Sequence, residues 1–350
     1  MSFWTDKRVF LTGDTGFKGS WLAIWLTRLG ARVSGYALPP PTRPSLFEAA
    51  RVGELIDHKD GDIRDAEGLA AAMIAAKPEI LIHMAAQSLV RPSYEDPLGT
   101  FATNVMGTAH VLDAMRRVPS LRVGLMITSD KCYENREWVY GYRETDAMGG
   151  FDPYSSSKGC AELVTAAWRR SFLGDRAVAS ARAGNVIGGG DWAADRLVPD
   201  LARALVRGES PIIRNPRATR PWQHVLDPLA GYMTLCQRLW DEPAAFSDGW
   251  NFGPLDDDAK PVAWIADTVC REWGDGANWT LQQAGQAPHE AHLLKLDCSK
   301  ARAELGWSGR WHIADALAHA VGWYKAFGVG ADARSLCFAD MDAFDKVAAP

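Results

Sequence analysis

The sequence predicts an α/β fold in which a doubly wound parallel sheet carries a smaller mixed α/β lobe at its C-terminal end. Through the first half of the 350 residues, short apolar runs alternate with helix-like segments. Three glycines follow the first of these runs, and the strict alternation ends near residue 182. Strands that alternate with helices form parallel sheets, and a glycine-rich corner after the first strand is typical of the Rossmann type.

The expected strands and helices follow from apolar runs and from residues that end helices. We expect strands over residues 9–11, 31–36, 55–59, 78–84, 121–128 and 178–181. The expected helices end at Leu29 and Ala76 or cover 97–117 and 154–170, and Gly30 should stop the first of them. Residues 250–252 form one more apolar run, which can return to the main sheet.

Composition and charge argue against several classes of protein. Hydrophobic residues make up 47% and charged residues 23%, as in an ordinary globular chain, and the formal net charge of -5 argues against a nucleic-acid partner. No apolar run is long enough to cross a bilayer, and the N-terminus reaches a strand too soon for a signal peptide. The six scattered cysteines indicate reduced thiols in the cytoplasm, without disulfides or a metal site.

The glycine corner is the stretch TGDTGFKG at residues 12–19. Gly13, Gly16 and Gly19 allow a sharp turn and a close approach of backbone to a ligand, and the following helix offers unpaired N–H groups. A dinucleotide pyrophosphate suits such a corner, although glycines there are also common for purely structural reasons. Asp14 would lie near phosphate charge, and it should weaken binding unless its side chain turns away.

Asp62 follows the third expected strand, where its carboxylate can accept a hydrogen bond from an adenine amino group. The alternative is a helix cap ahead of the segment that begins at Asp65. The end of the second strand lacks the carboxylate that usually holds the ribose of NAD, and Arg43 is slender support for a 2′-phosphate. NAD is the expected cofactor, and NADP stays open.

These features predict two interleaved units. A dinucleotide-binding domain covers residues 1–181 and receives contributions from about residues 220–253. A substrate-binding lobe covers residues 182–350, where loops lengthen and helices mix with short strands.

A tyrosine and a lysine lie one helical turn apart in the segment FDPYSSSK at residues 151–158. Tyr154 and Lys158 share a helix face, and the lysine ammonium makes a phenolate less costly, which turns the phenol into a base. Alone, this spacing is common by chance. The triplet of Ser129, Asp130 and Lys131, at the carboxyl end of the preceding strand, makes it persuasive because ligands bind at that edge of a parallel sheet.

The chain resembles the extended short-chain dehydrogenase/reductase superfamily and, within it, the nucleotide-sugar 4,6-dehydratases. The resemblance covers nearly the whole chain: TGDTGFKGSW at 12–21, HMAAQ at 83–87, NVMGT at 104–108, SDKCYEN at 129–135, RAGNVIGGGDW at 182–192, RPWQHV at 220–225, WNFGP at 250–254 and LDCSKA at 296–301. The Ser-Asp-Lys triplet is the specific feature, since epimerases of the superfamily lack such an acid–base pair.

The resemblance implies a reaction in three stages. Tyr154 removes the hydroxyl proton at carbon 4 of the sugar while Ser129 bonds the oxygen. Asp130 is the acid and Lys131 the base for loss of water across carbons 5 and 6, and the hydride returns to carbon 6. Such a lysine needs a lowered pKa and such an aspartic acid a raised one. An exposed Asp–Lys pair at a strand end is the structural alternative.

The resemblance also implies the ligand contacts and the assembly. Expected cofactor contacts are Gly13, Gly16, Phe17, Gly19, Asp62, Ile63, Ala85, Ala86, Asn104, Tyr154 and Lys158. Expected substrate contacts are Gln87, Asn185, Arg196, Arg220 and Asn251, although each can have only a structural role. The implied substrate is a nucleotide sugar, CDP-glucose first, in deoxysugar and O-antigen biosynthesis. A homodimer is expected through helices 97–117 and 154–170, to which Val105, Leu112, Leu163 and Ala167 can contribute.

Two other functions fit parts of the sequence. A sugar-nucleotide epimerase or reductase would share the fold but would not need the acid–base pair at 130–131. A non-catalytic dinucleotide-binding regulator need not retain Tyr154 and Lys158.

Overall fold

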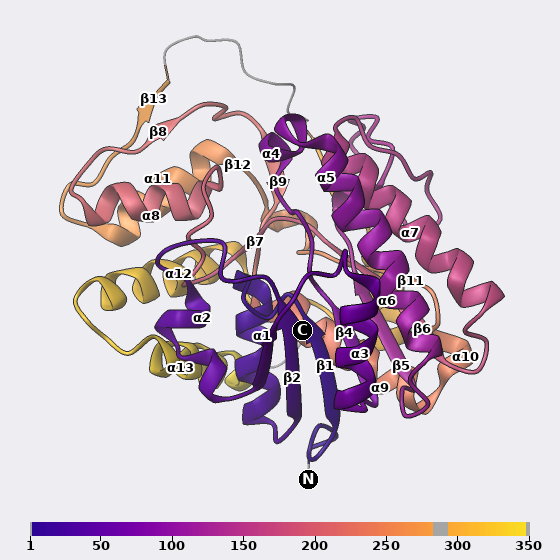
Figure 1. Ribbon diagram of the computed structural model, residues 1–350. Helices are drawn as coiled ribbons and strands as arrows, with labels where there is room; N and C mark the ends of the chain where they lie inside the picture. Colours follow the sequence, from indigo (N-terminus) through magenta and orange to yellow (C-terminus); the bar gives the residue numbers. More distant parts are fainter. Residues whose placement is uncertain (1, 283–292, 348–350) are drawn as a thin grey trace.

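The computed structural model describes residues 2–282 and 293–347, and its centre is a seven-stranded sheet (Figure 1). From one edge to the other the strands are β11 (Gly249–Phe252), β6 (Ala177–Ala183), β5 (Val123–Ile127), β4 (Ile80–His83), β1 (Arg8–Thr12), β2 (Arg32–Ala37) and β3 (Asp57–Asp60). Every neighbouring pair is parallel. The strand order reverses between β1 and β4, so their carboxyl ends mark the switch point at which such sheets bind ligands.

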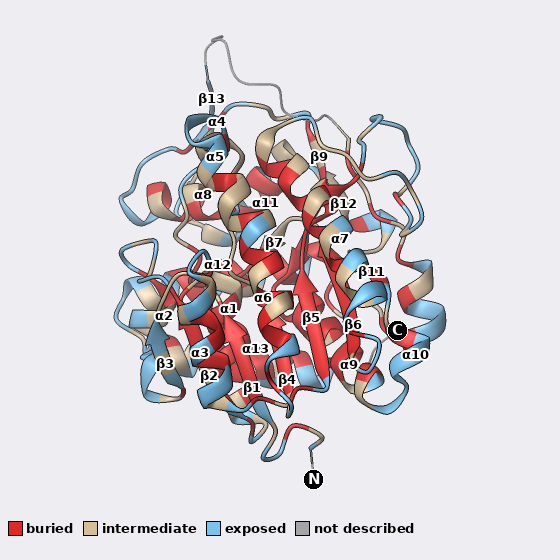
Figure 2. Cartoon of the chain, turned by 45° about the vertical axis from the view of Figure 1, so that its right-hand side comes forward, coloured by how far each residue is buried: buried red, intermediate tan, exposed pale blue. Residues whose placement is uncertain are grey.

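The predicted doubly wound α/β class is confirmed. Each expected strand has a counterpart within about two residues of its predicted ends, and residues 250–252 do return to the main sheet as part of β11, beside β6. Strand interiors are buried on both faces, as Figure 2 shows for β1, β4, β5 and β6. Burial on both faces explains why these strands form continuous apolar runs in the sequence.

Two layers of helices cover the two faces of the sheet. On one face α3 (Ala66–Ala76), α6 (Gly107–Arg116) and α7 (Pro153–Ser171) pack on Phe10, Leu81 and Val178. On the other face α1 (Phe17–Arg28) and α9 (Leu226–Asp241) pack on the alternate strand residues, such as Leu11 and Leu125. Successive side chains of a strand point to opposite faces, so a single strand supplies both layers of the core.

The helix expected over 97–117 is interrupted by one π-helical turn. It comprises α5 (Pro97–Phe101), the π turn η2 (Ala102–Met106) and α6. Short helices α4 (Val90–Glu95), α2 (Leu46–Ala49), η1 (Val52–Glu54) and α10 (Pro243–Phe246) connect the larger elements. A π turn places one extra residue in the turn and frequently marks a functional position, and this one carries Asn104.

The smaller lobe lies above the carboxyl edge of the sheet (Figure 1). Its helices α8 (Leu197–Val206), α11 (Val262–Trp273) and α12 (Ile313–Gly328) contact one another. Its strands form three small pairs: β7 (Val186–Ile187) with β10 (Gln223–His224), β9 (Thr219–Pro221) with β12 (Ala259–Pro261), and β8 (Ile212–Ile213) with β13 (Thr280–Leu281). Turns η4 (Asp256–Asp258) and η5 (Ala301–Leu305) complete it.

The C-terminal helix α13 (Ala333–Lys346) lies against α1 and α2, although its residues were expected in the C-terminal lobe. The Phe344 ring meets Trp25 of α1 at 5.8 Å, and Arg51 after α2 pairs with Asp332 at 2.9 Å. The outer side of α1 is apolar and needs a cover, which α13 provides. Sequence periodicity shows an amphipathic helix but does not show which layer receives it.

In the part of the chain that the structure describes, no helix combines the length and the apolar character needed to cross a membrane.

The glycine corner joins β1, α1 and β4 at backbone contact. Gly13 has φ +79°, and a Cβ there would lie 2.6 Å from the backbone nitrogen of Ala85. A Cβ on Gly19 would lie 2.1 Å from the carbonyl oxygen of Gly13. Neither neighbour is a flexible side chain, so both positions require glycine.

We expect Gly19→Ala to lower the free energy of unfolding by about 2–3 kcal/mol, because the added methyl overlaps a fixed carbonyl. Gly322→Ala is the matched control, since its Cβ meets nothing within 4 Å in the interior of α12. It should stabilise the protein by about 0.5–1 kcal/mol. Urea titration of both variants measures the two effects, and equal stabilities would contradict the close contact at Gly19.

Candidate active site

The glycine corner presents the start of α1 without a side-chain cap. Gly16 occupies the N-cap position in extended conformation, and no side chain accepts from the first turn. An uncapped N-terminus next to close-packed glycines fits a pyrophosphate, because free N–H groups and the helix dipole both favour an anion. The residues present therefore fit a dinucleotide cofactor. Phe17 is the first helical residue, and the backbone of Ala85 meets the corner from the end of β4.

Asp14 turns away from this corner, which answers the question that the sequence left open. Its Oδ2 lies 2.6 Å from Nδ1 of His58 on β3, and the side chain is fully buried. A Cβ on Gly35 of β2 would lie 2.4 Å from the same oxygen, so the carboxylate is held under β2. Burial raises the pKa of Asp14, and the charge of His58 opposes that rise.

Asp62 and Ile63 follow β3 on the cofactor side of the sheet. The Asp62 carboxylate accepts hydrogen bonds from the backbone and side chain of Arg64 at 2.8 Å each, and this pairing lowers its pKa. The helix-cap alternative for Asp62 is wrong, since Asp65 caps α3 by accepting from the N–H of Gly68 at 3.0 Å. Ile63 is buried in the core. An adenine contact by Asp62 stays a prediction.

The expected acid, base and hydroxyl groups converge where β5 ends. Ser129 donates to Oδ1 of Asp130 at 2.8 Å and accepts from the backbone N–H of Lys131 at 3.2 Å. Helix α7 begins at Pro153, with Asp152 as its cap, and brings Tyr154 and Lys158 to the same place. Four of these five residues are buried and Lys131 is half-buried, so the alternative of an exposed Asp–Lys pair is wrong.

Burial dominates the electrostatics of this cluster. It raises the pKa of Tyr154 to about 12, while a hydrogen bond with Ser129 and the charge of Arg196 act in the opposite direction. It lowers the pKa of Lys158 to about 8. It also raises the pKa of Asp130, whose Oδ2 is buried without a hydrogen-bond partner. A raised carboxyl pKa is what a proton donor needs at neutral pH.

Three residues expected to contact ligands have amide side chains that are hydrogen-bonded to other protein groups. Gln87 uses both N–H groups on Leu89 and Thr100 and accepts from the N–H of Leu89. Asn104 bonds both backbone groups of Gln87 and donates to Ser157 of α7. Asn251 is fully buried, accepts from Tyr133 and donates to two carbonyls.

These contacts favour the structural alternative for Gln87 and Asn251, and ligand contacts by Gln87, Asn104 and Asn251 stay predictions. An amide that has no free donor cannot give an N–H to a ligand. Asn104 and Gln87 fix the loop after β4 against α7, and Asn251 joins β11 to the segment after η3 (Asp130–Cys132).

The arginines expected to bind substrate lie on the lobe side of the cluster. Arg196 donates to Asp191 at 2.9 Å and to Ser88 at 3.1 Å, and its charge acts on Tyr154. Arg220 on β9 is buried, and its charge acts on Asp130. Asn185 is half-buried, and its carbonyl accepts from the N–H of Gln223. Both guanidinium groups therefore face the converging residues from the opposite lobe.

Sequence reasoning missed Lys18, although it lies inside the glycine corner. Its Nζ donates to the hydroxyl of Tyr232 on α9 at 2.9 Å, under the same cluster. Burial, with the charges of Lys158 and Arg196, lowers the pKa of Lys18 to about 7. The sequence did contain a signal, which is the position of Lys18 between two glycines of the corner. A lysine in a place that is packed against buried strands must either reach solvent or meet a ligand.

Across residues 2–282 and 293–347, no group of three or more His, Cys, Asp or Glu side chains meets in a way that could hold a metal ion.

The fold is similar to that of solved enzymes whose names refer to nucleotide sugars. The fold matches UDP-glucose 4-epimerase from Stenotrophomonas maltophila, solved with NAD, at TM-score 0.80 and 21% identity, over 93% of this chain and 100% of that one. It matches dTDP-glucose 4,6-dehydratase from Bacillus anthracis, also solved with NAD, at TM-score 0.76 and 17% identity, over 91% and 96% of the chains.

The chain belongs to the GDP-mannose 4,6-dehydratase family, whose model matches residues 10–319. It is also 56% identical to the CDP-glucose 4,6-dehydratase of Salmonella typhimurium over 338 residues, which cover 95% of this chain and 94% of that protein. These matches confirm the resemblance to the nucleotide-sugar 4,6-dehydratases.

Replacement of Lys18 should change how stability depends on pH. The pKa of Lys18 is about 7 in the folded protein, below the ordinary lysine value of 10.5 that applies to the unfolded chain. Between these values the unfolded chain binds the extra proton, so the wild-type free energy of unfolding should rise with pH relative to that of Lys18→Met. Thermal melts of both proteins from about pH 7 to about pH 10 measure this difference. Parallel curves would contradict the buried, neutral lysine.

Proposed function

We propose that the protein is a hydro-lyase that converts CDP-glucose to CDP-4-keto-6-deoxyglucose with bound NAD. The observation that carries this proposal is the convergence of Ser129, Asp130 and Lys131 with Tyr154 and Lys158 at the end of β5. The 56% identity to a CDP-glucose 4,6-dehydratase supports the choice of nucleotide sugar. The uncapped start of α1 supports a dinucleotide, and the similar structures solved with NAD favour NAD over NADP.

Oxidation at carbon 4 is assigned to Tyr154, Ser129 and Lys158. Tyr154 takes the hydroxyl proton as the hydride leaves carbon 4, and Ser129 donates to the same oxygen. Bound NAD would supply the acceptor for the hydride from carbon 4, the donor of the hydride to carbon 6, and a positive charge that favours the phenolate. Burial opposes ionisation of Tyr154, and the hydrogen bond with Ser129 and the charge of Arg196 assist it.

Loss of water is assigned to Asp130 and Lys131. A ketone at carbon 4 acidifies the proton at carbon 5, and Lys131 removes it. Asp130 donates its proton to the hydroxyl leaving carbon 6, and the raised carboxyl pKa keeps that proton available. Hydride arrival at carbon 6 and a proton at carbon 5 complete the 4-keto-6-deoxy sugar, so the balance is one water lost and no net oxidation.

Ligand contacts follow from the same arrangement. We assign the cofactor pyrophosphate to the corner at Gly13, Gly16 and Gly19, with Phe17, Ala85 and Ala86 beside it. The substrate diphosphate is assigned to Arg196 and Arg220, because two guanidinium groups that face one site bind a diphosphate in forked hydrogen bonds. Asn185 stays a proposed substrate contact, and Asp62 and Ile63 stay proposed for the adenine.

We propose a homodimer through the helices α5 to α7. Leu98, Met106 and Leu163 are exposed by 82%, 52% and 59% on these helices, and such apolar side chains on one face indicate an interface. Ala167 is exposed and Val105 half-buried, whereas Leu112 belongs to the core and does not contribute. Light scattering that gives the mass of one chain would contradict the dimer. The six cysteines are free thiols, which supports a cytoplasmic location.

The function is tested with purified protein, CDP-glucose and no added reductant. We expect a product lighter by one water, and a deuterium label placed at carbon 4 should be recovered at carbon 6. UDP-glucose, dTDP-glucose and GDP-mannose serve as matched substrates for the choice of base and sugar. An isomer of unchanged mass would instead indicate an epimerase, and no change after addition of NAD would indicate a regulator.

Lys131→Met should stop water loss while it leaves reduction of the cofactor measurable. The substitution removes only the amine that takes the proton from carbon 5, so the rate of water loss should fall by about 10²–10⁴-fold. Single-turnover absorbance of the reduced nicotinamide, together with product mass, separates the two steps. Lys260→Met, whose ammonium lies 5.6 Å from the Trp264 ring, is the control for loss of one lysine charge. Unaffected turnover would remove Lys131 from the mechanism.

A further inference from the structure

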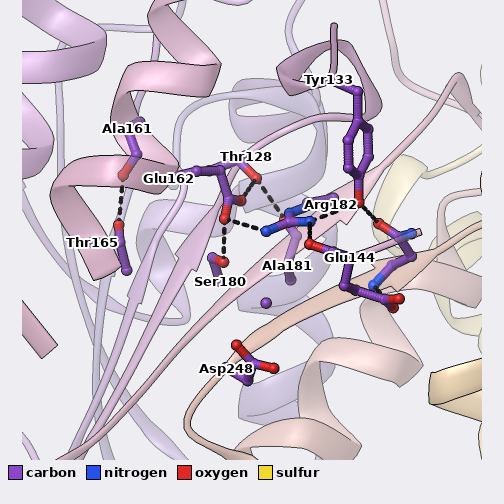
Figure 3. Close-up of polar contacts among 12 residues, drawn as sticks. Thr128, Tyr133, Glu144, Ala161, Glu162, Thr165, Ser180, Ala181, Arg182 and Asp248 are labelled. Carbon is purple, nitrogen blue, oxygen red and sulfur yellow. Dashed lines mark hydrogen bonds and ion pairs between the residues drawn. The ribbon is translucent and has the colours of Figure 1, made fainter. Parts of the chain in front are cut away.

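A buried ion pair lies directly behind the proposed catalytic turn. Glu162 on α7 and Arg182 on β6 are joined at 2.8 Å, with both side chains 5% exposed (Figure 3). Neither residue belongs to the reaction proposed above. Burying two charges costs desolvation energy, and a hydrophobic pair of similar size is often as stable, so such a pair calls for a role beyond stability.

The Glu162 carboxylate holds the end of strand β5. Its Oε1 accepts from the hydroxyl of Thr128, the residue before Ser129. Its Oε2 accepts from Ser180 on β6 at 2.6 Å and from Arg182. One carboxylate thus ties α7, β5 and β6 together immediately before the triplet begins, as the dashed lines in Figure 3 show.

The Arg182 guanidinium holds the other end of the same turn. Its Nη1 donates to the hydroxyl of Tyr133 at 2.6 Å, and the guanidinium carbon lies 5.1 Å from the centre of that ring. The same hydroxyl donates to Asn251 on β11 at 2.7 Å. Tyr133 is the residue that follows η3, so the three proposed catalytic positions 129–131 lie between two fixed residues, Thr128 and Tyr133.

The same carboxylate acts on the proposed catalytic lysine. Lys158 precedes Glu162 by one turn of α7, and its Nζ donates to the carbonyl of Ile127 at 3.4 Å. Burial lowers the pKa of Lys158, and the negative charge of Glu162 opposes that change. The ammonium and the turn are therefore positioned from one buried anion.

We propose that the Glu162–Arg182 ion pair is a positioning clamp, which fixes the turn carrying Ser129, Asp130 and Lys131 from both ends and aligns it with Lys158. This inference rests on the proposed function for the roles of the clamped residues. A proton donor and a base that must reach adjacent carbons tolerate little displacement, so a clamp at both ends of a short turn has a direct kinetic purpose.

The first test separates the clamp from general packing. Tyr133→Phe keeps the ring and removes the hydroxyl that joins Arg182 to Asn251. We expect water loss to slow by about 10–100-fold, more than oxidation at carbon 4 slows. The matched control is Tyr142→Phe, since Tyr142 stacks on Tyr133 at 5.3 Å while its hydroxyl bonds Asn135, outside the clamp. Equal rates for Tyr133→Phe and the control would overturn the proposal.

The second test uses the charge. Glu162→Gln should move the alkaline limb of the pH–rate profile to lower pH, because the anion that keeps Lys158 protonated is gone. If this variant does not fold, Glu162→Leu combined with Arg182→Met removes the unpaired charge and should recover the melting temperature. That double variant should keep the displaced limb. A wild-type profile in either variant would contradict the clamp.

A third readout does not depend on any substrate. Amide hydrogen exchange over residues 128–133 should quicken in Tyr133→Phe and stay at the wild-type rate in Tyr142→Phe. If wild-type protein leaves CDP-glucose unchanged while exchange responds as expected, the proposed function fails and the clamp stands. If CDP-glucose is dehydrated while exchange and the pH profile do not respond, the clamp fails and the proposed function stands.

Discussion

The close backbone contact at the glycine corner is the constraint on which the site depends. Gly13 meets Ala85 and Gly19 meets Gly13 at distances that admit no Cβ, so β1, α1 and β4 can only meet in this arrangement. That contact sets the start of α1 at the switch point of the sheet and turns its uncapped N–H groups toward the carboxyl ends of the strands. It also fixes where Lys18 enters the cluster. A methyl group at either glycine would displace the cofactor end and the catalytic end of the site together.

Much of the fold could be predicted because local pattern and tertiary environment agree. Alternation of apolar runs with helices, Pro153 at the start of α7 and the glycine spacing each point to the element that forms. The triplet and the Tyr–Lys pair were likewise visible, since their spacing along the chain is also their arrangement in space. Such signals are local, and each can be read without knowledge of what packs on it.

The features that the sequence did not show depend on partners that lie far away in the chain. Asn104 and Asn251 are polar residues near the site, and nothing local shows that their amides are bonded to Ser157 and Tyr133. The position of α13 over α1, and the clamp between α7 and β6, also depend on contacts across many residues. Composition and spacing identify a polar residue, but only the fold decides whether it meets a ligand or another side chain.

The charges around the site explain why it suits two ligands that each carry one diphosphate. The charge of Arg196 acts on Tyr154, the charge of Arg220 acts on Asp130, and Lys18 interacts with Lys158, Arg196 and Asp130. Asp130 also has one oxygen without a partner. Cations held in a poorly hydrated place are costly unless an anion joins them. A dinucleotide and a nucleotide sugar each bring a diphosphate, so their binding relieves that cost and raises the lysine pKa values. The low dielectric of this buried place makes the cations costly in the free protein. The same low dielectric strengthens every charge–charge contact made during proton transfer.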